Sequence, residues 1–429
     1  MKAAVIGYGK SGKAAENILR LDGFTDIDIF DDGNAGMLNT AQFEDNYDCV
    51  VVSPGIDLKK MAKAPKNFTS EIELAHAKKS AGSAVVAVTG TNGKSTVTTL
   101  TAQILKKCGV QAVACGNIGL TYAEAVTGFD FGAYIVELSS FQTGMLNKFS
   151  ADCVIVTNLA EDHMDRYADI DEYADDKIRL LNFLDENGRL IIENCKYLAE
   201  KSAVYKGETI MVDPELSGMP NLSEGVLDFN GFYVSVASFL LKGRHNIVNL
   251  AFALLAVDKL VGLKGDVTYL IEDLHGLEHR CEHVALIKAV EYINDSKGTN
   301  LHSTLTALKG FDKGVVIILG GKDKNGDFTL LIEELNEKAA AVIAYGHAGE
   351  KIYKTLKGSV RADVYKTADL EAAVLKGFEV ARPGQKVVLS PGCASFDEHR
   401  NFEHRGTHFK EIVGKIKAEE NERTERQQA

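Results

Sequence analysis

The chain has 429 residues, and its 48 basic and 60 acidic side chains give a formal net charge of -12 at pH 7. Hydrophobic residues (45%) and charged residues (25%) occur in the proportions of a globular protein. The acidic balance and the lack of a basic patch argue against a nucleic-acid partner, and no run is long enough to cross a membrane. We expect no signal peptide, because Met1-Lys2 leads directly into an apolar strand. Seven cysteines without paired spacing predict reduced thiols and a cytoplasmic protein.

Strand-like and helix-length segments alternate along almost the whole chain. This alternation predicts an α/β fold with largely parallel sheets. The length exceeds what one hydrophobic core supports, so we expect two or three domains. Helices are predicted over 171–184 and 402–417, and the charged tail 418–429 is expected to be frayed.

Residues 3–32 form one pattern: an apolar strand, the turn Gly7-Tyr8-Gly9-Lys10-Ser11-Gly12, a helix, and a second strand that ends at Asp31-Asp32. Alone, this pattern favours an NAD-dependent oxidoreductase. However, the next strand and the turn Pro54-Gly55 leave room for little more than one mononucleotide-binding half. We therefore favour a nucleotide or sugar nucleotide whose diphosphate lies at Gly9–Gly12.

A second glycine-rich loop follows the apolar run Ala84–Thr89. The turn Gly90-Thr91-Asn92-Gly93 continues through Lys94-Ser95-Thr96 into a predicted helix. This order of strand, loop and helix is typical of a phosphate-binding loop, in which backbone amides face an anion. Lys94 can reach terminal phosphates, and the Ser95 hydroxyl can ligate Mg²⁺. Val88 stands where the usual motif has its first glycine, but the strand context still indicates a phosphate site.

Polar side chains follow further strands in the next part of the chain. One strand leads to Asn117, another ends at Glu137, and a third is followed by His163. The carboxyl ends of parallel strands meet at one edge of a sheet, so Glu137 and His163 should lie near Ser95. A hydroxyl and a carboxylate suit Mg²⁺. His163 is a less usual Mg²⁺ ligand, and the residues alone leave open whether it binds a metal or caps a helix.

Four motifs occur in order along this region: Gly90–Thr96, Gly116–Gly119, Glu137–Gln142 and Asp162–Arg166. Together they resemble the ATP-dependent Mur ligases, and the resemblance runs from Gly7 to about Phe409. It is strongest to the branch that adds D-glutamate to UDP-N-acetylmuramoyl-L-alanine in peptidoglycan synthesis. The resemblance implies three α/β domains with mostly parallel sheets: 1–80 for the UDP-substrate, 81–276 for ATP, and 277–429 for the amino acid. The central one would be a P-loop ATPase-type domain.

The resemblance also implies which residues act. The catalytic residues would be Lys94, Glu137, His163, Lys177 and Lys297. ATP would be bound by Gly90, Thr91, Asn92, Gly93, Lys94, Ser95, Thr96, Asn117, Asn246, Asn249, Arg280 and Asp295. The UDP-substrate would be bound by Gly9, Lys10, Ser11, Gly12, Asp31, Asp32, Ser53, Pro54, Gly55, Asn117, Ser139 and Gln142. D-Glutamate would be bound by Thr299, Lys324, Ser395, Phe396 and Phe402.

Two Mg²⁺ sites are implied, with Ser95 and Glu137 at the first and His163 at the second. Lys177 falls where the family carries a carbamylated lysine, an anionic oxygen ligand of the kind that Mg²⁺ accepts. On the residues alone, Lys177 lies beside Asp175 and Asp176 and would be a solvated helix lysine.

The implied reaction forms an amide. The γ-phosphoryl group of ATP would move to a substrate carboxylate, and the amine of D-glutamate would attack the resulting acyl phosphate. The partners would be small molecules only (UDP-N-acetylmuramoyl-L-alanine, D-glutamate and ATP), and we expect a monomer without membrane insertion. The alternatives are another Mur-type amino-acid ligase, an NAD-dependent oxidoreductase that uses the first glycine loop, and a non-catalytic nucleotide switch.

The chain near its end carries a group of histidines and a glycine at a position of interest. His404 and His408 are four residues apart in a predicted helix, with His399 nearby. The helical repeat explains this spacing and the His-Glu-x-x-His order is absent, so the pattern favours a structural cluster over a metal site. Gly392 stands where the family more often has alanine.

Overall fold

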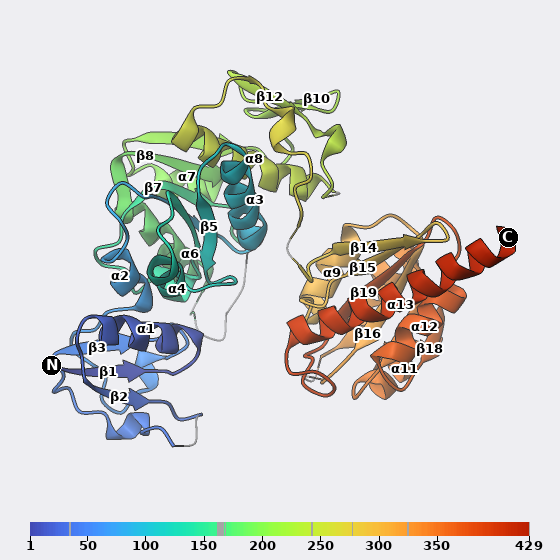
Figure 1. Cartoon of the computed structure of the whole chain (residues 1–429), viewed down its shortest axis with the longest axis horizontal. Coiled ribbons are helices and arrows are strands. Elements are labelled where there is room, and N and C mark those ends of the chain that lie inside the picture. The colour runs from blue at the N-terminus through green and yellow to red at the C-terminus, as the bar shows by residue number, and fades with distance from the viewer. Residues whose placement is uncertain are drawn as a thin grey trace. The chain divides into compact units, whose positions relative to one another are not determined.

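The computed structural model describes residues 1–33, 36–160, 167, 169–241, 243–276, 278–323 and 326–428. They form two compact units, Met1–His275 and Gly276–Ala429. Each unit alternates helices with mostly parallel strands (Figure 1). The predicted α/β class with largely parallel sheets is therefore confirmed, whereas the three-domain division stays a prediction.

The first unit begins with a small parallel sheet in the order β2-β1-β3. Its elements are β1 (Lys2–Ile6), α1 (Lys10–Leu21), β2 (Asp26–Phe30) and β3 (Cys49–Val52), and α2 (Glu71–His76) leads on to the next sheet. Ile18 of α1 packs with Ile72 of α2 and with Tyr122 of the central region. Helix α1 therefore connects the small sheet, whose strands have hydrophobic clusters of their own, to the core of the central sheet.

The central sheet has six parallel strands in the order β5-β6-β4-β7-β8-β9. Its strands are β4 (Ala84–Thr89), β5 (Ala112–Gly116), β6 (Ala133–Glu137), β7 (Ala151–Val156), β8 (Leu184–Glu193) and β9 (Glu208–Val212). Its helices are α3 (Lys94–Lys107), α4 (Tyr122–Gly128), α5 (Ser140–Thr143), α6 (Ile170–Ile178), α7 (Lys196–Ser202) and α8 (Arg244–Val261). Helices α3 and α8 belong to one hydrophobic cluster, and α2 and α4 belong to the other.

The helix predicted over 171–184 is too long. It ends at Ile178, and a 3-10 turn, Arg179–Phe183, follows. Leu184 pairs with Ala151 of β7 as the first residue of β8, so the backbone must already be extended there. Pairing with a strand distant in sequence has overridden the local helical pattern.

A four-stranded sheet in the order β10-β11-β12-β13 completes the first unit (Figure 1). It consists of β10 (Asn221–Ser223), β11 (Val226–Asp228), β12 (Phe232–Ser235) and β13 (Gly265–Asp266). Leu227 and Val234 of this sheet join the hydrophobic cluster of α3 and α8. The sheet therefore supports the helix that follows the phosphate loop.

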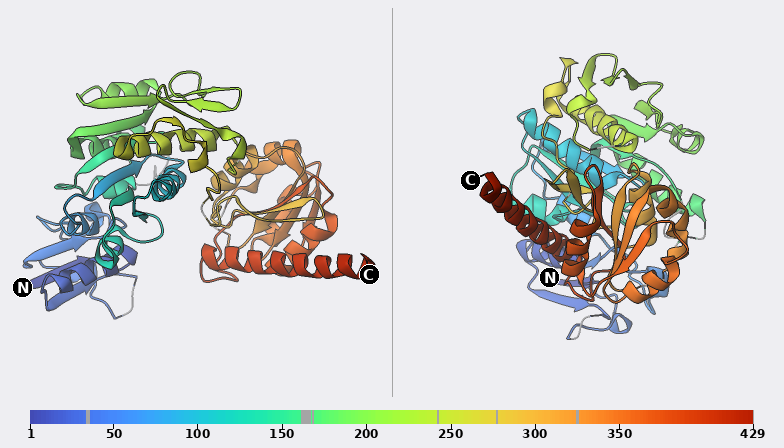
Figure 2. Two further views of the ribbon diagram at one scale, coloured as in Figure 1. Left: turned by 45° about the horizontal axis from the view of Figure 1, so that its top comes forward. Right: turned by 90° about the vertical axis from the view of Figure 1, so that its right-hand side faces the viewer.

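The second unit contains a six-stranded sheet in the order β14-β15-β19-β16-β17-β18, in which only the β14–β15 pair is antiparallel. Its strands are β14 (Glu282–Ile287), β15 (Val290–Asn294), β16 (Val315–Gly320), β17 (Ala339–Tyr345), β18 (Asp363–Lys366) and β19 (Lys386–Gly392). Its helices are α9 (Leu301–Lys309), α10 (Ile332–Lys338), α11 (Gly349–Leu356), α12 (Leu370–Val380) and α13 (Phe402–Gln428). Helices α12 and α13 cover one face, and α9, α10 and α11 cover the other (Figure 2).

The tail expected to be frayed is helical instead, because α13 continues to Gln428. Lys288 of the turn after β14 forms an ion pair with Glu420, and Arg423 pairs with Glu420 one turn further on. Most residues of this stretch are good helix formers, so little tertiary contact is needed to extend the helix. Along the described ranges, no helix combines the length and apolar character needed to cross a membrane.

Candidate active site

The second glycine-rich loop has the predicted geometry: β4 ends at Thr89 and α3 begins at Lys94. Gly90 and Gly93 have positive φ angles, +134° and +81°. A Cβ atom at Gly93 would lie 2.5 Å from Asn249 Oδ1, and one at Gly90 would lie 2.0 Å from Thr157 Oγ1. Both positions therefore require glycine. Val88, which stands where the usual motif has its first glycine, is buried in β4 and cannot provide the backbone freedom that Gly90 provides.

Residues directly after β7 fix the conformation of the loop through hydrogen bonds. The Asn92 amide donates to Asn158 Oδ1 over 2.8 Å, and the Thr157 hydroxyl donates to the Asn92 carbonyl oxygen. Lys94 curls back over the loop and donates from Nζ to the carbonyl oxygens of Gly90 (2.9 Å) and Thr91 (2.8 Å). The Lys94 ammonium therefore lies at the loop itself, and the order of strand, glycine-rich loop and helix is that of a phosphate-binding loop.

Glu137 lies next to this loop, because its Cα is paired with that of Val88 across β4 and β6. Its side chain is 2% exposed. Oε1 accepts a hydrogen bond from Asn117 Nδ2 over 3.1 Å, whereas Oε2 has no hydrogen-bond partner in the described part of the chain. A buried carboxylate oxygen without a partner is costly, and a hard cation such as Mg²⁺ would satisfy it. Ser95, at the start of α3, is also buried.

Lys177 is buried and not solvated, which overturns the surface interpretation. It is 1% exposed, its Nζ donates to the Gly90 carbonyl oxygen over 2.7 Å, and the same atom lies 4.4 Å from the centroid of the Tyr173 ring. The side chain of Lys177 therefore reaches from α6 to the backbone of the phosphate loop. His163, the other predicted ligand, lies outside the described residues.

The start of α8 also meets the loop, through the contact of Asn249 with Gly93 described above. Asn249 Nδ2 donates to Asn246 Oδ1 over 3.3 Å. The structure thus brings both predicted asparagines together at the loop, and a role toward adenine stays a prediction.

The first glycine loop has the close strand–helix packing expected of a mononucleotide-binding unit. A Cβ at Gly12 would lie 2.1 Å from the Gly7 carbonyl oxygen, and the Ser53 hydroxyl donates to the same oxygen over 2.6 Å. Asp31 accepts hydrogen bonds from the amides of Tyr8 (2.6 Å) and Gly33 (2.9 Å). The sheet has three strands, which is one mononucleotide-binding half and does not support the oxidoreductase alternative.

Other predicted UDP-substrate residues have local structural partners. Asp32 accepts from the Thr40 amide over 2.7 Å. Ser139 and Gln142 bond to one another and cap the short helix α5, and the Ser139 hydroxyl donates to Gln142 Oε1 over 2.9 Å. These hydrogen bonds fix the orientation of the Asp32, Ser139 and Gln142 side chains before any ligand binds.

The second unit carries a polar cluster at the end of β15. Asp295 is buried and accepts hydrogen bonds from the Ser390 hydroxyl (2.7 Å) and the Cys281 amide (3.2 Å). Burial raises the pKa of Asp295 to about 6, although the positive charge of Arg280 works against that shift. The Lys297 amide donates to the His279 carbonyl oxygen over 3.0 Å. Asp295, Arg280 and Lys297 therefore occupy one loop cluster.

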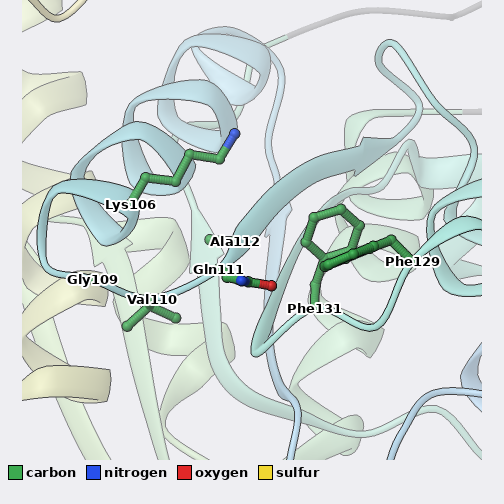
Figure 3. A pocket seen from close by; sticks show the side chains of 7 residues that line it. All are labelled: Lys106, Gly109, Val110, Gln111, Ala112, Phe129 and Phe131. Atoms are coloured by element: carbon green, nitrogen blue, oxygen red, sulfur yellow. The ribbon is translucent and has the colours of Figure 1, made fainter.

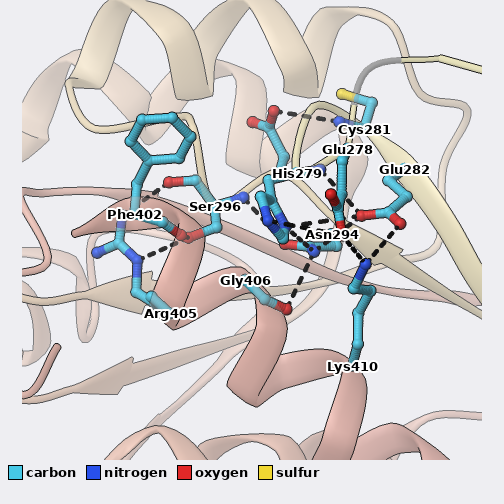
Figure 4. A network of polar contacts seen from close by, with 11 residues as sticks. Glu278, His279, Cys281, Glu282, Asn294, Ser296, Phe402, Arg405, Gly406 and Lys410 are labelled. Atoms are coloured by element: carbon cyan, nitrogen blue, oxygen red, sulfur yellow. Dashed lines mark hydrogen bonds and ion pairs between the residues drawn. The ribbon is translucent and has the colours of Figure 1, made fainter. Parts of the chain in front are cut away.

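His279 does not project from this cluster but forms part of a buried network. Asn294 Nδ2 lies 2.9 Å from His279 Nδ1 and donates to Gly406 O over 3.2 Å, and Lys410 pairs with Glu278 and Glu282 (Figure 4). Burial lowers the pKa of His279. The network ties the start of the unit to α13.

Arg405 is a buried residue of this cluster that the sequence did not single out. It is fully buried, and its guanidinium donates to the Ser296 hydroxyl (2.9 Å), the Ser296 carbonyl (2.8 Å) and the Cys393 carbonyl (3.1 Å). It therefore joins the Asp295–Lys297 loop to the loop after β19. The sequence does contain a sign of this burial, because the spacing of Phe402, Arg405 and Phe409 places all three on one face of a helix.

The described residues among the predicted D-glutamate ligands follow β15 and β19. Ser395 is buried after β19, Phe396 is 65% exposed, and the Phe402 ring lies 5.8 Å from Lys297 Nζ. Thr299 follows Lys297 and donates its amide to the Lys297 carbonyl. Lys324 lies outside the described residues. Gly392 has φ +67°, a conformation that costs alanine energy.

The three histidines near α13 form a cluster. His399 Nε2 lies 3.0 Å from His408 Nδ1, and the His404 ring centroid is 5.4 Å from that of His399. Burial and the neighbouring positive charges lower the pKa of His399 to about 4. No group of three metal-ligating side chains with suitable geometry occurs among the residues described here.

A pocket of about 350 Å³ lies elsewhere on the first unit (Figure 3). It is lined by Lys106, Gly109, Val110, Gln111, Ala112, Phe129 and Phe131. These residues lie at the amino ends of β5 and β6, whereas Glu137 and the phosphate loop lie at the carboxyl edge. The pocket is therefore separate from the nucleotide site.

A phosphate loop with a buried carboxylate beside it defines a nucleotide-binding α/β protein. Comparison with known proteins narrows this class. Residues 88–257 match the model of the Mur ligase middle domain, and residues 279–393 match that of the Mur ligase glutamate ligase domain. The chain belongs to the Mur ligase family, and the resemblance inferred from its motifs is confirmed.

Two relatives illustrate the match. The UDP-N-acetylmuramoylalanine--D-glutamate ligase of Geotalea daltonii is 37% identical over 85% of this chain and 83% of its own length. The protein of the same name from Solibacter usitatus is 33% identical over 96% of this chain and 97% of its own length.

Solved structures share the fold at low identity. The MurF ligase from Thermotoga maritima in complex with ADP has a TM-score of 0.56 and 14% identity, and the match covers 87% of this chain and 89% of that one. The UDP-N-acetylmuramate-alanine ligase of Thermotoga maritima has a TM-score of 0.56 and 16% identity over 97% of this chain and all (100%) of that one.

Proposed function

We propose that this protein is an ATP-dependent ligase that adds D-glutamate to UDP-N-acetylmuramoyl-L-alanine in peptidoglycan synthesis. The observation that carries the proposal is the buried Glu137 Oε2, which has no hydrogen-bond partner among the described residues and lies beside the phosphate loop of Lys94 and Ser95. The names of the curated relatives support the choice of substrates. A small-molecule reaction of this kind fits a cytoplasmic monomer.

The chemistry requires activation of a carboxylate, because its leaving group is poor and its charge repels nucleophiles. Transfer of the γ-phosphoryl group of ATP to the carboxylate of the alanyl group gives an acyl phosphate and ADP. The amine of D-glutamate then attacks the acyl carbon, phosphate leaves with the bonding electrons, and the amine loses a proton. Lys94 and Lys297 would neutralise charge on the phosphoryl oxygens, which is the main catalytic contribution in such transfers.

Two Mg²⁺ ions belong to the proposal. Ser95 and Glu137 would hold the first, and the buried Glu137 Oε2, which lacks a hydrogen-bond partner among the described residues, fits that role. His163 and Lys177 would hold the second, provided that Lys177 is carbamylated, because an ammonium group cannot ligate a cation. When bound, the ions would supply positive charge to the phosphate oxygens.

The substrate-binding residues follow from the two glycine loops and the second unit. We assign ATP to the phosphate loop with Asn117, Asn246, Asn249, Arg280 and Asp295. The diphosphate of the UDP-substrate is assigned to Gly9–Gly12, and its muramoyl-alanine part to Ser139 and Gln142. D-Glutamate is assigned to Thr299, Lys324, Ser395, Phe396 and Phe402.

Phosphate release tests the proposal. The wild-type protein should release phosphate only when ATP, Mg²⁺, UDP-N-acetylmuramoyl-L-alanine and an amino acid are all present, and D-glutamate should be the best of an amino-acid panel. Glu137→Gln, which keeps the shape but removes the charge, should lower the rate at least about 100-fold. Release that needs no UDP-substrate, or equal rates with L-alanine and D-glutamate, would contradict the assignment.

A further inference from the structure

Lys10 links the first glycine-rich loop to the turn that follows β5. It is the first residue of α1, and its ammonium group donates a hydrogen bond to the backbone carbonyl oxygen of Gly119. Lys10 belongs to the loop assigned to the diphosphate of the UDP-substrate. Gly119 belongs to the turn after β5, residues 116–120, which we call the Asn117 turn.

The Asn117 turn is packed directly on Glu137. The Asn117 amide donates to the Glu137 carbonyl oxygen over 2.9 Å, and Asn117 Nδ2 donates to Glu137 Oε1 over 3.1 Å. Gly116 has φ +96°, and a Cβ there would lie 2.3 Å from the same carbonyl oxygen. The turn closes on itself through the Gly116 amide and the Leu120 carbonyl, 2.9 Å apart. A shift of this turn must therefore move the Glu137 carboxylate.

A lysine ammonium has three N–H donors, and the Gly119 carbonyl uses one of them. The others remain able to contact a diphosphate at Gly9–Gly12 without breaking the bond to Gly119. A bound diphosphate would thus fix an exposed ammonium group that is only loosely held without it.

We propose that Lys10 is a positioning residue that couples binding of the UDP-substrate to binding of the Mg²⁺–nucleotide. The diphosphate fixes Lys10, Lys10 fixes the Asn117 turn, and the turn holds Glu137 where the cation needs it. This inference rests on the proposed function and adds a regulatory link between its two nucleotide sites. Each ligand should increase the affinity for the other by the same factor, because such coupling is reciprocal.

Isothermal titration measures this coupling directly, without turnover. The affinity for a non-hydrolysable ATP analogue with Mg²⁺ is compared with and without saturating UDP-N-acetylmuramoyl-L-alanine. We expect the wild-type affinity to rise about fivefold with the UDP-substrate, the lower end of typical couplings. Lys10→Met should reduce the increase to less than about twofold, and Lys10→Arg, which keeps the charge and several donors, should retain it in part.

Two further variants test the route. Lys13→Met is the matched control, because Lys13 lies on the same helix with its ammonium over the Tyr8 ring, 5.8 Å from the centroid. It should keep the wild-type coupling. Asn117→Ala should itself reduce the coupling, and Lys10→Met should then have no additional effect.

The outcomes separate this inference from the proposed function. If Lys10→Met lowers affinity for the UDP-substrate but keeps the fivefold coupling, Lys10 is a diphosphate contact only and the inference is wrong. Absence of coupling in the wild type would also overturn it. If the wild-type protein does not bind UDP-N-acetylmuramoyl-L-alanine at all, the proposed function fails as well.

Discussion

Lys177 Nζ donates a hydrogen bond to the carbonyl oxygen of Gly90, 2.7 Å away, although the two residues are 87 positions apart in the chain. The contact places a buried lysine from α6 on the loop that faces the phosphates. Lys94 Nζ donates to the same carbonyl oxygen at 2.9 Å. The Gly90 carbonyl oxygen therefore accepts hydrogen bonds from two lysines. Lys94 is the first residue of α3, which directly follows the loop, whereas Lys177 belongs to the distant helix α6.

Lys177→Ala should inactivate the ligase, because it removes the proposed carbamate ligand and the bond to Gly90. Millimolar acetate should restore part of the activity by standing in for the carbamate oxygens. Phosphate release with and without acetate is the measurement. Lys201→Ala, which removes a lysine paired with Asp175 at the surface of the same region, is the control and should leave activity unchanged. Full activity of Lys177→Ala in bicarbonate-free buffer would show that the lysine is not a ligand precursor.

Lys94→Ala should lower kcat about 10²–10³-fold while leaving the affinity for the UDP-substrate within about twofold of wild type. The reason is that Lys94 lies over the phosphate loop, whereas the UDP-substrate is assigned to the loop after β1. Steady-state kinetics and titration with the UDP-substrate measure the two effects. Lys106→Ala, at the exposed end of the same helix, should leave both unchanged. Activity of Lys94→Ala within threefold of wild type would remove Lys94 from the reaction.

Gly93→Ala and Gly109→Ala form a matched pair. Their φ angles are +81° and +83°, so each should lose about 1 kcal/mol of unfolding free energy from backbone strain alone. Only at Gly93 would the new Cβ meet another atom, Asn249 Oδ1 at 2.5 Å, whereas nothing lies within 4 Å of the site at Gly109. We therefore expect Gly93→Ala alone to weaken binding of an ATP analogue, by at least about tenfold. Equal loss of affinity in the two variants would mean that the contact with Asn249 does not shape the loop.

Acid should destabilise the second unit through His399. Burial and the neighbouring His408, His404 and Arg405 lower its pKa from 6.5 to about 4, whereas Asp397 acts in the opposite direction. Because the unfolded chain binds the proton more tightly, this stability is fully present above about pH 6.5 and is lost as the pH falls toward 4. Protonation would also leave the buried Nδ1 with a hydrogen and no acceptor in the described structure.

Urea unfolding of the full chain at pH 7 and pH 5 measures this effect. Between these values the wild type should lose about 2 kcal/mol that His399→Gln does not lose. His347→Gln, which changes an exposed histidine of the same unit, should lose as much as the wild type. The account of His399 fails if its variant and the wild type show the same pH dependence.

The site features that could be predicted from the sequence are those that depend on neighbours in the chain. The strand before Gly90, the helix after Lys94 and the carboxylate at the end of β6 follow from local patterns and from the rule that parallel strands align their carboxyl ends. The burial of Lys177 could not be predicted, because its neighbours Asp175 and Asp176 are acidic and suggest an exposed helix face. Its partner, Gly90, belongs to a loop far away in sequence.

The two errors in helix length have different causes. The helix at 171–184 ends early because Leu184 pairs with β7. Helix α13 continues because its residues are good helix formers, and the ion pair between Lys288 and Glu420 adds one tertiary contact. Arg405 was missed because a guanidinium is normally placed at the surface, whereas here the oxygens of Ser296 and Cys393 accept its hydrogen bonds in the interior.

The central claim is that the substrate carboxylate is activated as an acyl phosphate. The most direct measurement uses UDP-N-acetylmuramoyl-L-alanine labelled with ¹⁸O in its alanyl carboxylate, together with ATP, Mg²⁺ and D-glutamate. The carboxylate oxygen that attacks the γ-phosphoryl group leaves with the phosphate, so mass spectrometry should find one ¹⁸O atom in each phosphate released with product. Formation of the amide product with unlabelled phosphate would contradict the account.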